Sequence, residues 1–279
     1  MQVLKNGLYI ISTPIGNIKD ISQRAIEVLT EAQFIACEDS RVTKKLFSFL
    51  GISLQKKFIK CEDHSEEKQA DKFISLIKEG NIVALVSDAG SPLISDPGYK
   101  VVKRCQDQGV YVTVVPGACA VICALQLSGL PSNRFMFAGF IPNRDKARID
   151  LFNELKNINT TLIFYETAPR LLKSLECAQE FFVSRKISVI REITKLYEEV
   201  ITGEINEVLE HFRNNAPKGE FVFVVSPPEN IKKSIEDIRV ILKEKLAEMS
   251  LKCAVKEVSD KYGVNRNDVY TLALELKNE

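Results

Sequence analysis

The sequence predicts an α/β protein with two sheet domains and a helical C-terminal unit, and three observations support this prediction. Up to residue 116, short β-branched or aromatic runs alternate with helical patterns, which is typical of a mostly parallel sheet covered on both faces. Beyond it the candidate strands come closer together, and after Ser226-Pro227-Pro228 they stop. We therefore expect domains at 1–116, 117–228 and 229–279.

In the first domain a helix is expected over 21–31, with Asp20 as its N-cap and Gln23 at the third helical position. A second helix ends at Gly80, and a third lies between Pro97 and Gly109. Strands are expected at 8–12, 33–38, 56–60, 82–87 and 110–115.

In the second domain, the interval between the candidate strands 186–192 and 196–202 is too short for a crossover helix, so this sheet is expected to be mixed. The longest irregular loop is expected at 141–149. The other strands are expected at 135–140, 160–166 and 221–226, with helices near 118–128, 146–156, 169–182 and 204–214.

Residues 231–277 are expected to be helical throughout. Within them, apolar residues are spaced as two helices joined by a turn containing Gly263, the pattern of a helix-turn-helix. The apolar positions are Ala254, Val258, Val264, Val269 and Leu272.

Charge and cysteine content exclude several classes of protein. Lys and Arg number 38 against 37 Asp and Glu, so a dedicated nucleic-acid coat protein is excluded and any RNA contact is expected to be local. The residues after Met1 lack a secretory pattern, and the apolar run at 118–125 is too short to span a bilayer, so we expect a cytoplasmic protein without membrane association. Seven cysteines are expected to be mostly buried thiols.

Neither a metal site nor a catalytic triad is expected. Cys119 and Cys123 are four residues apart on one helix face but have no further Cys or His at metal-ligand spacing. The chain has two histidines, His64 and His211, and neither lies beside a plausible nucleophile.

Three turns at the ends of expected strands are rich in small residues. They are Ser12 to Asn17, Asp88 to Gly98 and Val115 to Ala118. Open α/β sheets bind ligands at the carboxyl ends of their strands, so these turns predict a pocket. The first turn lacks the glycines of a G-x-G-x-x-G loop, which argues against a dinucleotide.

Charged residues follow other strands: Glu38, Asp39 and Arg41 after one, Tyr165-Glu166 after another, and the segment 191–195 after a third. Each group alone is compatible with a solvated helix cap or with ion pairs. Their expected convergence on one sheet edge favours a site.

Eight segments occur in order through residues 12–200: TPIGN, CEDSR, VALVSDAGSPLISDPG, VPGACA, SGL, FAGFIP, FYETAPR and REITKLYEE. With these segments the chain resembles the tetrapyrrole-methylase superfamily, and within it the branch that methylates small-subunit ribosomal RNA. The helical tail also resembles the C-terminal helix-turn-helix of that branch.

The resemblance implies S-adenosylmethionine bound between two α/β domains, 2′-O-methylation of a cytidine ribose in the decoding region of 16S ribosomal RNA, and a homodimer. Ser40 and Ser91 stand where Thr is expected, and Cys119 where Ser is usual. The residues implied to surround the cofactor are Ile15, Gly16, Asp88, Ala89, Gly90, Ser91, Cys119, Ala120, Phe164, Tyr165, Ile193, Gly219 and Glu220.

A ribose hydroxyl is a weak nucleophile, so a group that takes its proton is expected. We predict Asp39, Glu192 and Lys195 around the 2′-hydroxyl, unless these charges pair with one another. RNA phosphates are expected at Arg41, Arg191, Arg144, Lys146, Arg148, Lys261 and Arg266. Two alternatives stay open: a methyltransferase acting on porphyrin precursors, and a ligand-sensing helix-turn-helix regulator.

Overall fold

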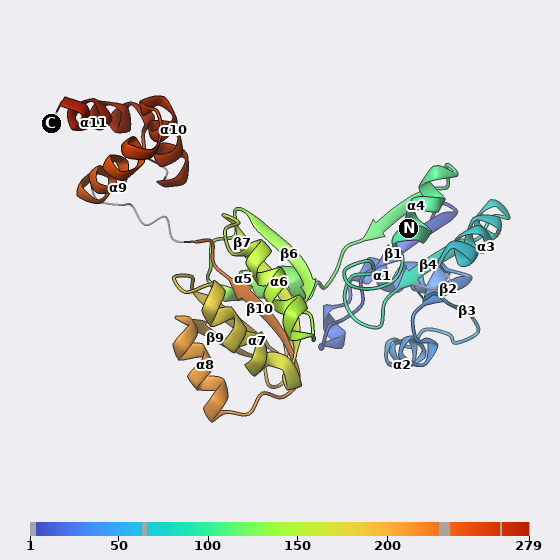
Figure 1. Ribbon diagram of the computed structural model, residues 1–279. Coiled ribbons are helices and arrows are strands. Elements are labelled where there is room, and N and C mark those ends of the chain that lie inside the picture. The colour runs from blue at the N-terminus through green and yellow to red at the C-terminus, as the bar shows by residue number, and fades with distance from the viewer. Residues whose placement is uncertain (1–3, 63–65, 229–234, 263, 279) are drawn as a thin grey trace. The chain divides into compact units, whose positions relative to one another are not determined.

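The computed structural model describes residues 4–62, 66–228, 235–262 and 264–278 (Figure 1). Its contacts divide the chain into two compact units, Met1–Pro227 and Pro228–Glu279. The first unit contains two five-stranded sheets. Residue 116 lies where the chain leaves the first sheet for the second, and the division into three domains stays a prediction.

The first sheet has the strand order β3-β2-β4-β1-β5, and every neighbouring pair is parallel. The central strand β4 is buried along its whole length, as expected for a parallel strand covered on both faces. The strands confirm the five expected ones: β1 (Gly7–Ile11), β2 (Phe34–Cys37), β3 (Lys57–Lys60), β4 (Ile82–Val86) and β5 (Val112–Val115).

Helices cover both faces of this sheet. On one face, α1 (Gln23–Glu31) contributes Val28 and Leu29 to the core, and α2 (Ser40–Leu50) contributes Phe47. On the other face, α3 (Glu66–Lys78) and α4 (Tyr99–Asp107) pack Phe73 and Val101 against the strands.

The expected N-cap of the first helix was wrong. Ser22 caps α1, because its hydroxyl oxygen accepts a hydrogen bond from the N–H of Ala25 at 3.1 Å. Asp20 instead ends the short 3₁₀ helix η1 (Ile18–Asp20), which lies between the end of β1 and α1. The N-cap lies two residues later than predicted, because Asp20 belongs to the 3₁₀ turn that precedes the α-helix.

The second sheet has the order β6-β7-β10-β8-β9, and its pairs are antiparallel except for β6 and β7. This confirms the mixed sheet expected from the short interval between β8 and β9. The bounds are β6 (Phe135–Phe140), β7 (Thr161–Thr167), β8 (Ile187–Arg191), β9 (Glu199–Gly203) and β10 (Glu220–Val225).

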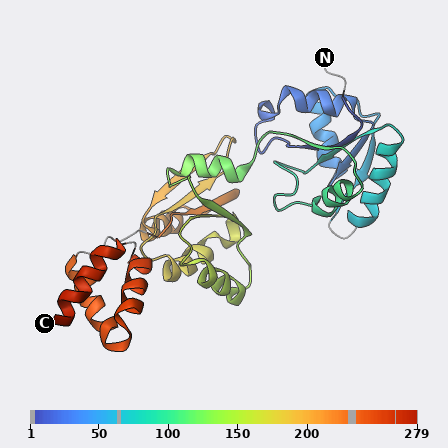
Figure 2. The same ribbon diagram turned by 90° about the horizontal axis from the view of Figure 1, so that it is seen from above.

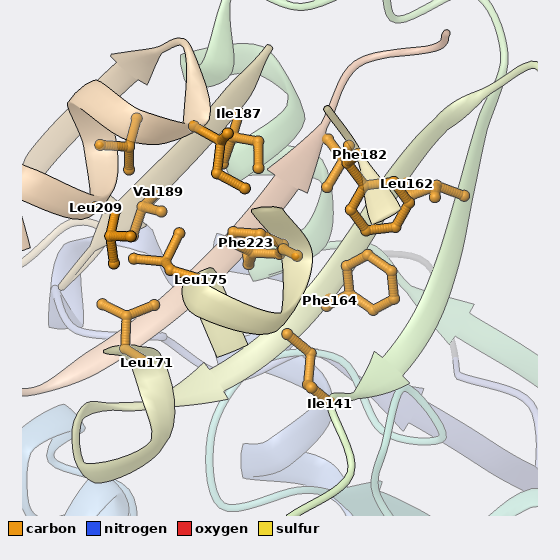
Figure 3. Close-up of a cluster of buried hydrophobic side chains, with 14 of the residues drawn as sticks. Ile141, Leu162, Phe164, Leu171, Leu175, Phe182, Ile187, Val189, Leu209 and Phe223 are labelled. Atoms are coloured by element: carbon orange, nitrogen blue, oxygen red, sulfur yellow. The ribbon is translucent and has the colours of Figure 1, made fainter. Parts of the chain in front are cut away.

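The two faces of the second sheet have separate cores. One packs against α6 (Asp145–Leu155), α7 (Ala168–Phe181) and α8 (Ile205–Asn214), and Figure 3 shows Phe223 of the sheet beside Leu175 of α7. The other face packs against α5 (Ala120–Ser128), whose Val121 and Leu125 contact the strands.

The loop expected at 141–149 is shorter than predicted, because α6 already begins at Asp145. Arg148 therefore lies in the first turn of a helix. Its side chain turns back to the connection before the helix, where its guanidinium donates to the carbonyl oxygens of Pro142 and Asn143 and pairs with Asp145.

The second unit consists, in its described part, of α9 (Ile235–Glu248), α10 (Leu251–Tyr262) and α11 (Arg266–Asn278), which Figure 2 shows in orange to red. Ala254, Val258 and Val269 are buried at their common core, and Val264 and Leu272 pack against it. This confirms the expected apolar spacing; Gly263 lies outside the described residues. Among the described helices, none has the length and apolar character needed to cross a membrane.

Candidate active site

A cavity of about 320 Å³ opens where loops of the first sheet meet the edge of the second. From the first sheet, the loops after β1 and β4 line it with Ile15 and with Asp88 to Ser91. From the second, β7, β10 and the segment after β8 line it with Tyr165, Val222 and Ile193. The cavity is thus at the carboxyl ends of the parallel strands, as the small-residue turns predicted.

Hydrogen bonds tie the three turns of the first sheet together. Thr13 and Gly90 exchange two backbone hydrogen bonds, of 2.8 and 3.1 Å, in an isolated antiparallel bridge. The hydroxyl groups of Ser12 and Ser91 lie 2.9 Å apart, and Ser91 donates to the carbonyl oxygen of Ala118 at 3.0 Å. These contacts fix the loops relative to one another before any ligand binds.

Asp88 connects this cradle to the end of β2. Its carboxylate accepts a hydrogen bond from the N–H of Asp39 at 3.1 Å. The side chain of Asp39 does not line the cavity. It forms an ion pair with Arg41 at 2.6 Å, and the hydrogen bonds from Arg41 lower the pKa of the Asp39 carboxyl to about 2. Because its side chain lies outside the cavity and is held by Arg41, Asp39 is not positioned to take a proton from a ligand in the cavity.

The other two predicted catalytic residues meet at the second sheet. Lys195 Nζ donates to Glu192 at 2.9 Å and to Glu220 at 2.7 Å, and the N–H of Glu220 donates to the same Glu192 oxygen at 3.0 Å. Burial opposes the charge on Glu192, but the hydrogen bonds from Lys195 and Glu220 outweigh it and lower the pKa of Glu192. Burial also opposes the charge on Lys195, but its two carboxylate partners raise its pKa overall. Lys195 is thus a cation at neutral pH.

Backbone strain gathers in the two loops that face each other across this site. Within the described residues, the non-glycine residues with positive φ are Leu93 at 72°, Ser95 at 67°, Glu192 at 48° and Thr194 at 65°. Such conformations persist when the surrounding structure enforces them, and they concentrate at functional sites. The distribution therefore supports the assignment of this cavity as the site.

An aromatic wall borders the cavity. The ring of Tyr165 packs edge-on between Phe137, with centroids 4.8 Å apart, and Phe140, at 5.3 Å. Burial raises the pKa of the Tyr165 hydroxyl, so this side chain is neutral. Val222, its cross-strand partner on β10, continues the apolar surface.

Glu166 is a buried carboxylate at the edge of the cavity, with 2% exposure. It pairs with Arg170 at 2.8 Å, accepts the N–H of Thr167 at 2.7 Å and accepts the hydroxyl of Ser174. Its charge is therefore compensated from the side of α7.

Carboxylates outnumber cations in the lining. Asp88, Asp96, Glu166, Glu192 and Glu220 line the cavity, and among the residues that the structure describes its one lysine or arginine is Lys195. Such a lining favours a positively charged ligand and disfavours one rich in phosphate.

Of the predicted cofactor residues, nine line this cavity: Ile15, Asp88, Ala89, Gly90, Ser91, Ala120, Tyr165, Ile193 and Glu220. The other four are placed elsewhere. Phe164 points to the opposite face of β7, into the core with α7, because side chains alternate along a strand. Cys119 is the N-cap residue of α5, Gly16 lines a neighbouring groove, and Gly219 packs against Glu192.

The predicted RNA contacts differ in their exposure. The Arg41 side chain is 90% exposed, whereas Arg148 is 4% exposed and its terminal nitrogens donate within its own loop, so Arg148 is not accessible to RNA. Arg191 is partly buried, donates to the carbonyl oxygen of Lys218 and lies 3.7 Å from Glu199. Arg144, Lys146 and Arg266 are exposed, and the side chain of Lys261 lies outside the described residues.

Eight lining residues received no individual role from the sequence, although three of them lie in the predicted turn Asp88 to Gly98 and Glu166 was among the charged residues expected at the site: Ile94, Ser95, Asp96, Phe140, Glu166, Thr167, Phe221 and Val222. A signal existed for most of them. Ile94 to Asp96 belong to the same small-residue loop as Asp88, and Phe140 ends a strand at the same edge. Phe221 and Val222 had no sequence signal, because their place depends on which strand pairs with β7.

No metal cluster emerges within the described residues: no group of three His, Cys, Asp or Glu side chains is arranged to hold an ion there. The seven cysteines are free thiols; Cys37, Cys61 and Cys105 are buried and Cys253 is exposed. His64 lies outside the described residues.

Two family models match the chain. One, described as Tetrapyrrole (Corrin/Porphyrin) Methylases, matches residues 7–209, and the other, described as the RsmI C-terminal HTH domain, matches residues 233–277. The Ribosomal RNA small subunit methyltransferase I of Erythrobacter litoralis is 49% identical over 98% of this chain and 96% of its own length. That of Rickettsia prowazekii is 48% identical over 80% of this chain and 79% of its own length.

Among solved structures, a cobalt precorrin-4 methyltransferase superposes with a TM-score of 0.56 at 16% identity, over 78% of this chain and 94% of that one. At this identity the likeness concerns the fold alone. Together with the family models, it confirms the predicted fold class.

Proposed function

This chain belongs to the tetrapyrrole (corrin/porphyrin) methylase family, and from that premise we propose that it is an S-adenosylmethionine-dependent methyltransferase acting on small-subunit ribosomal RNA. The names of its relatives support the RNA substrate, since relatives at 48% and 49% identity are ribosomal RNA methyltransferases. We propose the 2′-hydroxyl of a cytidine in the decoding region as the acceptor, in keeping with the resemblance of the sequence motifs.

The observation that carries the proposal for the methyl donor is the combination of charge and shape in the cavity. S-adenosylmethionine supplies an electrophilic methyl group on a positively charged sulfur. A lining in which, among the described residues, carboxylates outnumber cations suits that charge, and the Tyr165 side with Val222 offers an apolar surface for a nucleobase. The turn glycine Gly90, at φ 79°, lets the backbone approach a ligand closely.

The role of the charged cluster in the reaction follows from its protonation. Lys195 is protonated, so it cannot accept the proton of the ribose hydroxyl, and its contribution is to hold Glu192 and Glu220 in place. The Glu192 carboxylate is the acceptor in our proposal. Its lowered pKa is compatible with this role. Once the hydroxyl oxygen carries the methyl group it is a protonated ether, a strong acid that gives its proton even to a weak base such as this carboxylate. Positioning of the two reactants then supplies much of the rate.

The exposed cations near the cavity and in the tail are proposed to contact RNA phosphates, Arg41 and Arg266 among them. A ribosomal substrate implies a cytoplasmic site of action. We further propose a homodimer, and light scattering that gives a monomer at micromolar concentration would reject it.

The test of the function is transfer of labelled methyl groups from S-adenosylmethionine. Small ribosomal subunits, a porphyrinogen and a sample without acceptor are compared, with the Glu192→Gln variant beside the wild type. Label in the subunit RNA, lost in the variant, supports the proposal. Label in the porphyrinogen alone would establish the tetrapyrrole alternative, and binding of cofactor without transfer to either would favour the regulator.

A further inference from the structure

A second hollow lies next to the cavity and shares Lys195 with it. This groove is lined by Gly16, Asn17 and Ile18 from the loop after β1, by Phe49 from α2, and by Thr194, Lys195 and Leu196 from the loop after β8. The two lining loops touch closely, because a Cβ on Gly16 would lie 2.4 Å from Lys195 Cγ. Whatever occupies the groove therefore lies beside the charged cluster of the site.

Large apolar side chains at the groove are strongly exposed. Phe49 is 69% exposed and Leu196 is 88% exposed, and Tyr197 next to it is 66% exposed. Exposed large apolar side chains that gather in one place mark an interaction site. Val183 is also an exposed apolar residue of this unit, but it does not line the groove.

Cations accompany the apolar side chains in a regular way. Arg41, Lys45 and Phe49 succeed one another every four residues along α2, so they share one helix face at steps of about 6 Å. Lys45 Nζ lies 5.8 Å from the centre of the Phe49 ring. Lys19 is exposed on η1, at the loop side of the groove.

We propose that this groove holds the single-stranded RNA that flanks the methylated nucleotide, with a base stacked on Phe49 against Leu196 and phosphates at Lys45 and Arg41. The inference rests on the proposed function. Single-stranded RNA is bound by aromatic side chains that stack bases, together with cations that follow the backbone. A second copy of the chain is the poorer occupant, because the centre of a protein interface is depleted of charged residues.

The experiment compares Phe49→Ala, Phe49→Leu and Phe49→Trp with Val183→Ser, which removes an exposed apolar side chain outside the groove. For each, KM and kcat are measured with small ribosomal subunits, together with S-adenosylmethionine affinity by calorimetry and molar mass by light scattering. We expect Phe49→Ala to raise KM about tenfold, within the range for loss of one stacked base, at unchanged cofactor affinity. Phe49→Leu should raise KM nearly as much, because leucine cannot stack on a base. The KM of Phe49→Trp and of Val183→Ser should stay within about twofold of the wild-type value.

The phosphate contact is tested separately by the salt dependence of subunit binding. Lys45→Gln is expected to reduce the slope of log affinity against log salt by about 0.7, the value for one phosphate of a single strand. An unchanged slope, or an unchanged KM in Phe49→Ala, overturns the proposal.

Two results separate it from its alternatives. If Phe49→Ala and Phe49→Leu convert a dimer into monomers while Phe49→Trp does not, the groove is an interface between copies and the proposal is rejected. If the wild type transfers no methyl group to subunits, the proposed function itself fails, whatever the Phe49 variants do. Transfer by the wild type with no effect at Phe49 rejects the groove alone.

Discussion

Gly219 holds open the space that the Glu192 carboxyl occupies, and this makes Gly219→Ala a sharp test of the site. An added Cβ would lie 2.6 Å from both Cδ and Oε1 of Glu192, closer than non-bonded atoms tolerate, so the carboxyl must move. Oε1 is the atom that accepts hydrogen bonds from Lys195 and from the N–H of Glu220. The substitution therefore disconnects the charged cluster without removing any of its members.

The expected loss in the free energy of unfolding is the sum of backbone strain and of weakened hydrogen bonds. The positive φ of 94° at Gly219 costs an alanine about 1–2 kcal/mol of strain. Hydrogen bonds to a charged group contribute about 1.5–3 kcal/mol, but water replaces part of this because the Glu192 and Lys195 side chains are 18% and 28% exposed. About 1–2 kcal/mol remains for the displacement, so the free energy of unfolding should fall by about 2–4 kcal/mol.

Gly109→Ala is the matched control. Gly109 also has a positive φ, of 67°, but an added Cβ meets nothing within 4 Å. It should lose only the strain, about 1–2 kcal/mol. Urea unfolding measures both losses, and calorimetry and methyl transfer measure function, which should fall in Gly219→Ala alone. Equal losses of stability, with cofactor affinity and transfer both at the wild-type level in Gly219→Ala, would refute the reasoning.

Other predictions address other parts of the chain. Asp88→Asn keeps the shape of the loop but removes its charge, so S-adenosylmethionine affinity should fall about tenfold, a loss of about 1.4 kcal/mol; unchanged affinity by calorimetry would remove this loop from the binding site. The Asp39 carboxyl should titrate by NMR near a pKa of about 2 instead of 3.8, and Arg41→Ala should return its pKa toward 3.8. Because folding depresses this pKa, the ion pair stabilises the fold above pH 3.8, and this stabilisation fades as the pH falls toward 2. A normal titration of Asp39 in the wild type would contradict the ion pair. Burial raises the pKa of the Cys105 thiol to about 11, so at pH 8 a thiol reagent should spare it in the folded protein, and fast labelling there would show that the α4 face opens. Truncation after Pro228 should preserve cofactor affinity and melting of the first unit while methylation of ribosomal subunits falls steeply; full activity in a stable truncate would reject RNA binding by the tail, and joint loss of all three would indicate a packing role.

The strands and the site loops were predictable because they depend on local patterns. Apolar runs between turn residues marked all ten strands, and the small residues after β1 and β4 marked the cavity, whereas the turn Val115 to Ala118 after β5 does not line it. Both signals depend on the residue types within a short segment, so they can be recognised without knowing which strands pair.

Side-chain direction was less predictable. Phe164 and Tyr165 are neighbours in one motif, yet one fills the core with α7 and the other lines the cavity. Which of them faces the ligand depends on which sheet face receives α5, a tertiary fact. The ion pairs of Arg148 with Asp145 and of Asp39 with Arg41 were hard to predict for a related reason, because partners that are close in sequence meet only in the folded geometry.

Alternate residues of β8 and β10 belong to two different cores, one on each face of the second sheet. On β10, Phe223 and Val225 serve the core with α7 and α8, while Val222 and Val224 face α5 and the cavity side; on β8, Val189 and Ile190 divide in the same way. Of the residues that face α5, Val222 lines the cavity, whereas Val224 and Ile190 are buried in the core with α5. A lineage can therefore change what the pocket accepts at Val222 while its neighbours on both faces keep the sheet stable. Variants at Val222 should therefore alter ligand preference more often than stability, whereas variants at Val224 should lower stability first.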